Sequence, residues 1–390
     1  MPGAALRLKR GRDSRVRAHP WIFKGDVADV SDVEPGAVVT IVDSAGHFVG
    51  RGFYNPRPAL CCRVLTWRDE PVDDAFLGRR VESAVARRIR DGALPSLARL
   101  VWTEADGLPG LVIDRYGPVV VIQCLTLGMA RRRRDVVAAL RMAVGELPVF
   151  SMDDSTQASL EGFEAEHGWI DRAGPADVVV DEGSVKLRVT LGQGQKTGLY
   201  LDQRENRLRI AAHAAGREVL DAFSYTGGFA CHALVAGARR AVCLESSHEA
   251  IAGARENFKL NEVADRAEVV GGNAFDELRR LDRSRERFGL VVLDPPPFAR
   301  GREALDAAAR GYKEINLRAM RLLAPGGVLA TFSCSHHVSV EMFETICREA
   351  AADAGVSLRV LRRLTQASDH PELLTVAETR YLKGLLLEAV

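Results

Sequence analysis

The chain has 390 residues, which at roughly 150 residues per domain predicts two or three domains and excludes a single small module. Hydrophobic residues make up 47% and charged residues 27%, a composition typical of globular proteins and not of long disordered ones. Because 53 Lys and Arg face 52 Asp and Glu, the net charge of +1 predicts no polyanionic partner, and a nucleic-acid signal has to come from the distribution of charge.

The sequence lacks the features of membrane and secreted proteins. No stretch reaches the roughly 18 to 20 consecutive apolar residues of a membrane-spanning helix, and the first residues contain no apolar core of a secretory signal. We therefore expect a cytoplasmic protein with no membrane partner. The seven cysteines lack CxxC spacing, which favours reduced, mostly buried thiols and predicts no metal site.

Residues 1–70 are predicted to form a small β-barrel. Short apolar and β-branched runs at 38–42, 47–53 and 60–67 are separated by Gly, Pro and Asp turns. A basic stripe interleaved with aromatic residues precedes them and is opposed only by Asp13. It consists of Arg7, Lys9, Arg10, Arg12, Arg15, Arg17 and Lys24, with His19, Trp21 and Phe23. Such a stripe favours contact with a phosphate backbone and stacked bases over a merely solvated surface.

Residues 71–185 show the pattern of an α+β domain. Amphipathic helices are predicted over 74–90 and 129–144, and 110–123 contains strand material split at Tyr116 and Gly117. The second helix carries the arginine run 131–134. Such a run is more often a solvated helix face than a polyanion site.

From residue 186 onward, apolar strands alternate with helices of 10 to 15 residues, which is typical of a parallel sheet covered on both faces. A hairpin pattern at 178–191 leads into this part of the chain. The predicted strands are 217–223, 240–245, 267–272, 289–294 and 326–333. Two terminal β runs, 357–364 and 380–390, are close enough in sequence to form an antiparallel edge.

Ligands bind such sheets outside the carboxyl ends of the strands, so the residues found there are candidates for a site. The first strand ends at Asp221 and the glycine turn 224–228, and the second ends at Glu245, which is placed to accept hydrogen bonds from ribose hydroxyls. Asn273 and Ala274 follow the third strand and suit an adenine ring. Because the turn lacks GxGxxG and a Walker lysine, an adenosine with an uncharged or zwitterionic tail fits better than a pyrophosphate.

Two further strand ends predict a base clamp and a nucleophile. The run 294–298, DPPPF, is rigid and offers backbone carbonyls as acceptors beside an aromatic ring, although a plain turn is the alternative. Such a loop suits a base with an exocyclic amino group. Cys334 follows the fifth strand among polar residues, where a thiol can act as a nucleophile, whereas the other six cysteines lie in apolar patterns.

These segments resemble the successive motifs of a class I S-adenosylmethionine-dependent methyltransferase: VLDAFSYTGGF, CLESS, GGNAF, VVLDPPPF and FSCSHH. GQKTGLYLDQREN, TEADGLPGLVIDRYG, QASDHPELLTVAETRYLKG and HPWIF are similar to large-subunit ribosomal RNA cytosine-C5 methyltransferases of the RlmI type. The resemblance covers essentially the whole chain. It implies a PUA domain at 1–70, a central α+β domain at 71–185, and a Rossmann-like α/β methyltransferase domain at 186–390 with a seven-stranded mixed sheet whose seventh strand is antiparallel.

The resemblance also implies S-adenosyl-L-methionine as the cofactor, and 23S rRNA or a large-subunit assembly intermediate as the partner. It assigns the cofactor to Asp202, Arg204, Asp221, Ser224, Tyr225, Thr226, Gly227, Glu245, Asn273 and Ala274. It makes Asp294 the contact to the target base and Cys334 the nucleophile. RNA contacts are expected at Arg10, Arg12 and Arg15 of the basic stripe and at Pro295 and Phe298 of the proline loop.

The implied chemistry explains these residue types. A thiolate that attacks C6 of cytosine makes C5 nucleophilic enough to take a methyl group, and release of the thiolate then requires loss of the C5 proton. Asp294 could stabilise the charge that develops on the base. Enzymes with two cysteines carry one after the proline of strand four, where this chain has Pro296. The base that removes the proton is therefore open among His336, His337 and a water.

The sequence leaves three other functions open. DPPPF also resembles the loop of amino-group methyltransferases, so guanine or another base is an alternative target that needs no covalent Cys334. An RNA-binding assembly factor without turnover is a second alternative. An NAD-dependent dehydrogenase is remote because GxGxxG is missing. The sequence does not specify the modified nucleotide, and it leaves a homodimer open.

Overall fold

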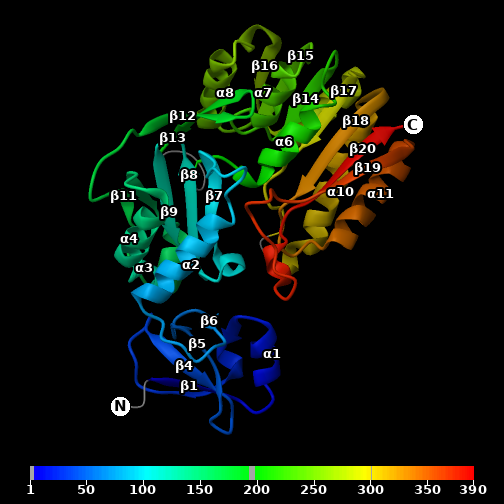
Figure 1. Cartoon of the computed structure of the whole chain (residues 1–390). Helices are drawn as coiled ribbons and strands as arrows, with labels where there is room; N and C mark the ends of the chain where they lie inside the picture. Colours follow the sequence, from blue (N-terminus) through cyan, green and yellow to red (C-terminus); the bar gives the residue numbers. More distant parts are fainter. Residues whose placement is uncertain (1–3, 193–197, 300) are drawn as a thin grey trace. The chain divides into compact units, whose positions relative to one another are not determined.

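The computed structural model describes residues 4–192, 198–299 and 301–390. Contacts divide the chain into two compact units, which can be followed by colour in Figure 1. Unit 1 consists of Met1–Val178, Val189–Leu199 and Asp369–Thr379, and unit 2 of Val179–Arg188, Tyr200–Ser368 and Arg380–Val390. The domain boundaries at residues 70 and 185 stay a prediction. Among the helices of the described ranges, none has the length and apolar character that a membrane crossing requires.

Unit 1 begins with a six-stranded sheet in the order β2-β6-β5-β4-β1-β3 within the described residues. Its strands are β1 (Ala5–Leu8), β2 (Trp21–Phe23), β3 (Val27–Val30), β4 (Val38–Val42), β5 (Phe48–Tyr54) and β6 (Leu60–Thr66). The predicted runs at 38–42, 47–53 and 60–67 are therefore confirmed as strands. The purely β interpretation of this segment was wrong at α1 (Asp13–Ala18), a short helix inside the basic stripe that buries Val16 in the core.

The second sheet of unit 1 has the order β11-β10-β9-β8-β7 among the described strands, with helices packed against it. Its elements are α2 (Asp74–Ala86), β7 (Leu97–Trp102), β8 (Leu111–Tyr116), β9 (Val119–Cys124), α3 (Leu127–Ala130), α4 (Arg133–Val144), β10 (Val149–Met152), α5 (Ser155–Glu161) and β11 (His167–Ile170). Asp73 is the N-cap of α2, and its side chain accepts a hydrogen bond from the backbone N–H of Phe76 at 2.8 Å. The predicted helix at 74–90 is confirmed over Asp74–Ala86, four residues shorter than expected, and the two strands around Tyr116 are confirmed.

The arginine run of unit 1 differs from its prediction in two ways. The expected single helix over 129–144 is broken into α3 and α4 at residues 131–132. In addition, Arg133 is not solvated but buried, and it forms ion pairs with Asp153 and Glu166. A buried cation needs such partners, and they lie 20 and 33 residues further along the chain, so the local pattern could not show them.

A two-stranded sheet of β12 (Asp177–Glu182) and β13 (Val185–Thr190) confirms the predicted hairpin. The main sheet of unit 2 follows in the order β16-β15-β14-β17-β18-β20-β19. Its strands are β14 (Glu218–Ala222), β15 (Arg240–Glu245), β16 (Ala267–Gly271), β17 (Phe288–Leu293), β18 (Leu323–Ser333), β19 (Leu358–Leu364) and β20 (Lys383–Ala389). β14 to β18 are parallel, and β20 runs antiparallel between β18 and β19, so the predicted seven-stranded mixed sheet is confirmed.

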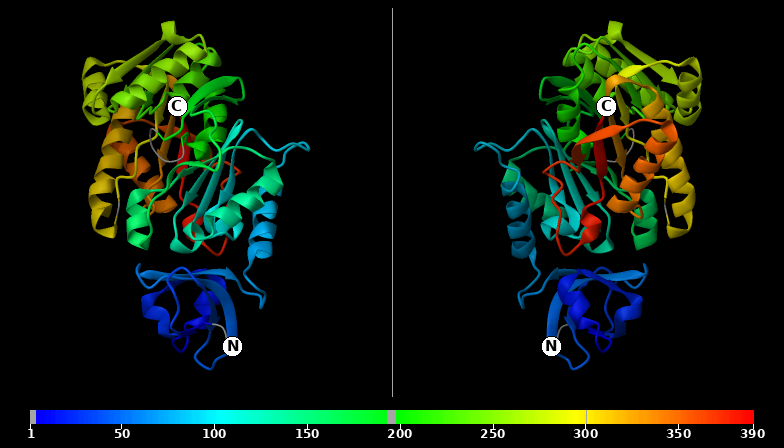
Figure 2. Two further views of the ribbon diagram at one scale, coloured as in Figure 1. Left: turned by 90° about the vertical axis from the view of Figure 1, so that its left-hand side faces the viewer. Right: turned by 90° about the vertical axis from the view of Figure 1, so that its right-hand side faces the viewer.

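Helices cover both faces of this sheet. They are α6 (Arg204–Ala211), α7 (Gly228–Val235), α8 (His248–Leu260), α9 (Ala274–Ser284), α10 (Leu305–Arg321) and α11 (Val340–Ala354). α7 contacts α6 and α8, whereas α10 contacts α9 and α11. Figure 2 shows the yellow and orange helices on one side of the sheet and the green ones on the other. The fold is therefore an α/β sandwich of three layers.

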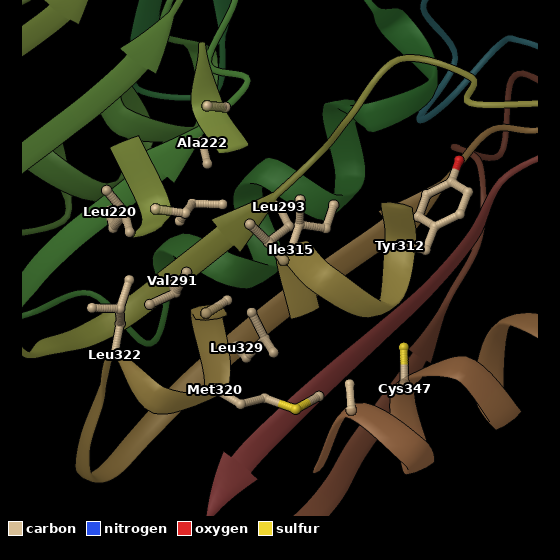
Figure 3. Packing of buried hydrophobic residues seen from close by; sticks show 14 of the residues in the cluster. Leu220, Ala222, Val291, Leu293, Tyr312, Ile315, Met320, Leu322, Leu329 and Cys347 are labelled. Carbon is tan, nitrogen blue, oxygen red and sulfur yellow. The ribbon is translucent and has the colours of Figure 1, made fainter. Parts of the chain in front are cut away.

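The core of unit 2 explains the continuous apolar strands in the sequence. Leu220, Val291 and Leu329 come from three adjacent strands and are fully buried against α10, where Ile315 and Met320 face them (Figure 3). Strands that are buried on both faces need apolar side chains in both directions, which removes the alternation seen in half-exposed strands. This rigid core fixes where the carboxyl ends of the parallel strands lie.

Candidate active site

The candidate residues of unit 2 lie along one edge of its sheet. Because β14 to β18 are parallel, their carboxyl ends share that edge. In spatial order, the edge presents Asn273 after β16, Glu245 at the end of β15, Asp221 in β14, Asp294 after β17 and Cys334 after β18. The strand order reverses next to β14, where doubly wound sheets bind their ligands.

The turn between β14 and α7 has an unusual backbone. Phe223 and Tyr225 have φ angles of 63° and 48°, a region that side chains other than glycine rarely adopt. Gly227 has a φ of 73°, and a Cβ there would lie 2.7 Å from the Phe258 ring. Strained residues of this kind persist only where packing holds them and are concentrated at ligand sites. The strained turn leads directly into the N-terminus of α7.

Glu245 holds this turn through three hydrogen bonds. Its carboxylate accepts the backbone N–H groups of Tyr225 at 2.8 Å, Ser246 at 2.8 Å and Ser247 at 2.9 Å. Ser247 in turn begins α8 by accepting the N–H of Ala250. The half-buried carboxylate is thus oriented at the sheet edge in the place from which the sequence predicts a contact to ribose.

Asp221 is a buried carboxyl group that can accept a further hydrogen bond. It is 0% exposed, and its Oδ2 accepts the N–H of Ala230 in the first turn of α7 at 3.0 Å. Its Oδ1 has no hydrogen-bond partner among the described residues. Burial raises the pKa of Asp221 to about 8, and the carboxylates of Asp294 and Glu245 also raise it. A positively charged or N–H donor group of a ligand would relieve this unsatisfied oxygen.

The other predicted cofactor residues are distributed over the same turn and the segments beside it. Ser224 donates its N–H to Leu244 at 3.1 Å, and the Thr226 carbonyl accepts Asn257 Nδ2 at 2.9 Å. Asn273 begins α9 by accepting the N–H of Phe275 at 2.9 Å, and Ala274 is the first residue of that helix. Asp202 is buried and Arg204, at the start of α6, is half-buried. Residues 194–197 of the GQKTG motif lie outside the described residues.

The structure adds three residues that the sequence reasoning missed. Gln203 is 2% exposed and donates its Nε2 to Asp294 Oδ1 at 3.0 Å, while its own Oε1 accepts Asn206 Nδ2 at 2.7 Å. Tyr381 donates its hydroxyl to Asp202 Oδ2 at 2.7 Å. The Tyr200 ring packs edge-on against that of Tyr225, with centroids 5.2 Å apart. Gln203 and Tyr381 lie in motifs quoted above, but no local signal distinguished them from their neighbours.

Cys334 and the next residue, Ser335, contact the proline loop 294–298. The Cys334 thiol lies 3.7 Å from the Pro295 carbonyl oxygen. Ser335 Oγ accepts the N–H of Phe298 at 3.1 Å and shares a 2.8 Å hydrogen bond with the Tyr312 hydroxyl. The thiol therefore sits beside a backbone acceptor in a loop that is fixed by prolines and by its bonds to the next strand end.

The seven cysteines all lie in the described ranges, and all are free thiols. Six are buried and Cys334 alone is half-exposed, as the sequence predicted. Burial raises the pKa of Cys124 and Cys347 to about 12, which makes these thiols inert as nucleophiles.

The predicted RNA contacts of the basic stripe lie in unit 1. Arg10 is exposed and has no ion pair among the described residues. Arg12 and Arg15, in contrast, both form ion pairs with the buried Asp26, at 3.7 Å for Arg12. Trp21 is tied to Glu104 by a 2.9 Å hydrogen bond from its indole nitrogen. Of the three arginines predicted to contact RNA, Arg10 is therefore the one that no described carboxylate neutralises.

Comparisons with known proteins cover nearly the whole chain. A family model described as S-adenosylmethionine-dependent methyltransferase matches residues 167–388, and a PUA-like domain model matches residues 6–67. Ribosomal RNA large subunit methyltransferase I from Klebsiella pneumoniae (strain 342) is 40% identical over 388 residues, covering 97% of this chain and 96% of that protein. The protein of the same name from Citrobacter koseri is 39% identical, with 97% and 98% covered.

Solved structures agree with the fold. The crystal structure of the methyltransferase SMU.776 complexed with SAH superposes with a TM-score of 0.86 at 19% identity, covering 98% of this chain and 99% of that one. A second structure, a SAM-dependent methyltransferase from Streptococcus mutans, gives a TM-score of 0.84 at 18% identity, with 98% and 100% covered. The predicted fold class is therefore confirmed, both in the PUA-like segment and in the Rossmann-like domain.

Proposed function

Since the chain belongs to the S-adenosylmethionine-dependent methyltransferases, in the family of ribosomal RNA large subunit methyltransferase I, we propose that it methylates C5 of a cytidine in 23S rRNA. S-adenosyl-L-methionine is the cofactor of this family. One observation carries the choice of base and mechanism. Cys334, the half-exposed thiol at the sheet edge, lies 3.7 Å from the carbonyl oxygen of Pro295, the residue after Asp294, whose carboxylate would hold the base.

The residues of the edge fit the cofactor. S-adenosylmethionine supplies an electrophilic methyl group on a positively charged sulfur, and it carries an ammonium group and a ribose. The unsatisfied Oδ1 of Asp221 suits an N–H donor or a cation, and the carboxylate of Glu245 suits ribose hydroxyls. Asn273 and Ala274 would flank the adenine, with Asp202, Arg204 and the turn 224–227 around the methionine end.

The geometry supports the following roles for the chain's own groups. The thiolate of Cys334 attacks C6, and the electrons of the C5–C6 double bond move to C5, which takes the methyl group. Asp294, which is oriented by Gln203, accepts a hydrogen bond from the amino group of the base and so orients the ring for attack. Loss of the C5 proton then re-forms the double bond as the thiolate leaves. Pro296 occupies the place of the second cysteine, so within the described loop Cys334 is the thiol for both steps.

The direct test is nucleoside mass spectrometry. Large-subunit rRNA, either naked or in immature particles, is incubated with the protein and methyl-labelled S-adenosylmethionine, digested, and separated into nucleosides. We expect the label in 5-methylcytidine. Label in a methylguanosine would retain the methyltransferase and reject cytosine, and RNA binding without any label would support a non-catalytic assembly factor.

Glu245→Gln is expected to weaken cofactor binding by about tenfold, roughly 1.4 kcal/mol, because the amide keeps an acceptor for the Tyr225 N–H but loses the charge that strengthens hydrogen bonds from ribose. The rate at saturating cofactor should change less than about twofold. Calorimetric titration measures the affinity. Glu249→Gln, an exposed residue in the first turn of α8, is the matched control. An unchanged dissociation constant would remove Glu245 from the ribose site.

Replacing Arg10 and Arg12 by alanine should weaken RNA binding and flatten its salt dependence. Each lost phosphate contact lowers the slope of log K against log salt by about 0.7 to 0.9. Because Asp26 already neutralises part of the Arg12 charge, the combined decrease should be closer to one contact than to two. Filter binding at several salt concentrations gives the slope. The control replaces Arg239 and Arg283, two exposed arginines of unit 2, and an equal decrease there would contradict the assignment.

A further inference from the structure

Unit 2 contains a lysine buried beside the Cys334 loop. Lys383 is the first residue of β20, where it pairs with Ser333 of β18, and it is 5% exposed. Its Nζ donates a hydrogen bond to the carbonyl oxygen of Ser335 at 2.7 Å. The amine is therefore held at the short segment 333–335 that carries Cys334.

A buried lysine with this environment is unusual. Lysines are almost never fully buried unless an anion pairs with them, because desolvation of an ammonium group costs several kcal/mol. Among the described residues, no carboxylate oxygen lies within ion-pair distance of Lys383 Nζ, and its hydrogen bond goes to a neutral carbonyl. The buried amine of Lys383 therefore has no Asp or Glu as its counter-ion among the described residues.

The charges around Lys383 identify the anion. Burial lowers the pKa of Lys383 to about 8, the thiolate form of Cys334 acts in the opposite direction, and the cationic Arg380 lowers the pKa further. Cys334 is thus the group that favours the charged amine. The reverse also holds, because an ammonium group favours a nearby thiolate.

Other titratable groups lie around Cys334, and the carboxylates among them act against its ionisation. Burial raises the pKa of Tyr200, and so do the negative charges of Asp294, Asp202 and Cys334, which places these groups in one electrostatic neighbourhood. Burial raises the pKa of Tyr312, and the negative charge of Cys334 raises it further. The Tyr312 hydroxyl also shares a hydrogen bond with Ser335. His336 and His337 follow on the same loop, with rings 5.7 Å apart. The carboxylates oppose a thiolate at Cys334, whereas an ammonium group at Lys383 favours it.

We propose that Lys383 keeps Cys334 in its thiolate form by forming a thiolate–ammonium pair with it, and so activates the nucleophile. The thiol proton passes to the lysine amine, which stays an ammonium group through the reaction. The bond from sulfur to C6 forms and later breaks, while the C5 proton leaves to a different base. The ammonium stabilises the sulfur anion both before attack and after release. The use of this pair in catalysis rests on the proposed cytosine mechanism, but the pair itself does not.

The test measures ionisation of the thiol directly, without any reaction on RNA. Folded protein is treated with iodoacetamide between pH 5 and pH 10, and carboxamidomethylated Cys334 is quantified by peptide mass spectrometry. In the wild type, we expect the midpoint of reactivity to lie below the ordinary cysteine pKa of about 8.5. In Lys383→Met, the midpoint should rise by at least about one pH unit, which lowers the rate at pH 7 by about tenfold. Lys383→Arg should restore most of the reactivity, because it restores the cation.

Two controls separate this role from a structural one. Lys313→Met removes a partly exposed lysine of α10 that pairs with Glu349 and Asp353, and it should leave the alkylation profile unchanged. Circular dichroism and cofactor titration show whether each variant is folded. If Lys383→Met does not fold, the wild-type profile and that of Lys383→Arg still decide, because a wild-type midpoint at or above about 8.5 overturns the pair. A midpoint that Lys383→Met leaves unchanged overturns it too. The proposed function fails on a different result, namely activity that survives removal of Cys334.

Discussion

Cys334→Ala is expected to lower the rate of methyl transfer by at least about a thousandfold, because without a nucleophile C5 of cytosine does not become reactive enough to take the methyl group. Cofactor and RNA affinities should stay within about twofold, since the half-exposed thiol lies at the end of β18 and is not part of the core. Single-turnover rates with labelled cofactor and an rRNA fragment measure the first quantity, and titrations measure the second.

Cys347→Ala is the matched control for this variant. It truncates a buried thiol of α11 whose neighbour is Asn316, so it should reduce stability and leave the single-turnover rate of the folded enzyme nearly unchanged. A covalent trap gives a second readout. RNA with 5-fluorocytidine at the target position should form a complex with the wild type that survives denaturation, because fluorine cannot leave C5 as a proton does. The absence of this complex, or an active Cys334→Ala, would refute the covalent mechanism.

Glu182→Ala should lower the free energy of unfolding by about 3–5 kcal/mol, because it removes the anion from a buried ion pair. Glu182 accepts the Arg207 guanidinium at 2.5 and 2.7 Å and His232 Nε2 at 2.9 Å, and all three residues are buried. Without Glu182, Arg207 would be a buried cation without its carboxylate. Arg207 also donates to the carbonyl of Tyr200 at 3.1 Å, so the loss should reach the candidate site. Urea denaturation gives the value.

The surface pair of Arg240 and Glu268 provides the control. Both side chains are about half-exposed, and Glu268→Ala should cost no more than about 1 kcal/mol. The effect of Glu182 also has a defined pH dependence. Burial raises its pKa, but Arg207 more than compensates and the pKa falls to about 2, below the ordinary 4.5. A lowered carboxyl pKa stabilises the fold above the unfolded value, so the difference from the variant should be full at pH 7 and shrink as pH falls from about 4.5 to about 2. A loss below about 1 kcal/mol at pH 7 would show that the pair is dispensable.

The arrangement of unit 2 could be predicted from the sequence because its strands are buried on both faces. Leu220, Val291 and Leu329 belong to uninterrupted apolar runs, and such runs have few alternatives to a central parallel strand. Once the strands are parallel, Glu245 and Cys334 must lie on one edge, wherever the helices go. This part of the site follows from topology alone.

The remainder depends on contacts between distant parts of the chain. The hydrogen bond of Lys383 to Ser335 requires that β20 enter between β18 and β19 in one register, which a pattern of apolar residues does not specify. The hydrogen bond from Gln203 to Asp294 joins residues 91 positions apart, so no local pattern predicts it either. In unit 1, α4 begins at Arg133, which is paired with the distant Asp153, whereas propensity alone favours one continuous helix through this point.

Each unit consists of three separate segments, and this has a consequence for chimeric proteins. The six segments alternate along the chain, so no single crossover between two homologous genes exchanges a whole unit. A crossover after Val178 would leave Arg88 and Arg99 from one parent facing an Asp369 loop from the other. These arginines are buried, and Asp369 supplies a carbonyl to Arg88 at 2.8 Å and a carboxylate oxygen to the Arg99 N–H at 3.0 Å. Functional hybrids of this family therefore require that the loop at 369–379 be inherited with the N-terminal segment.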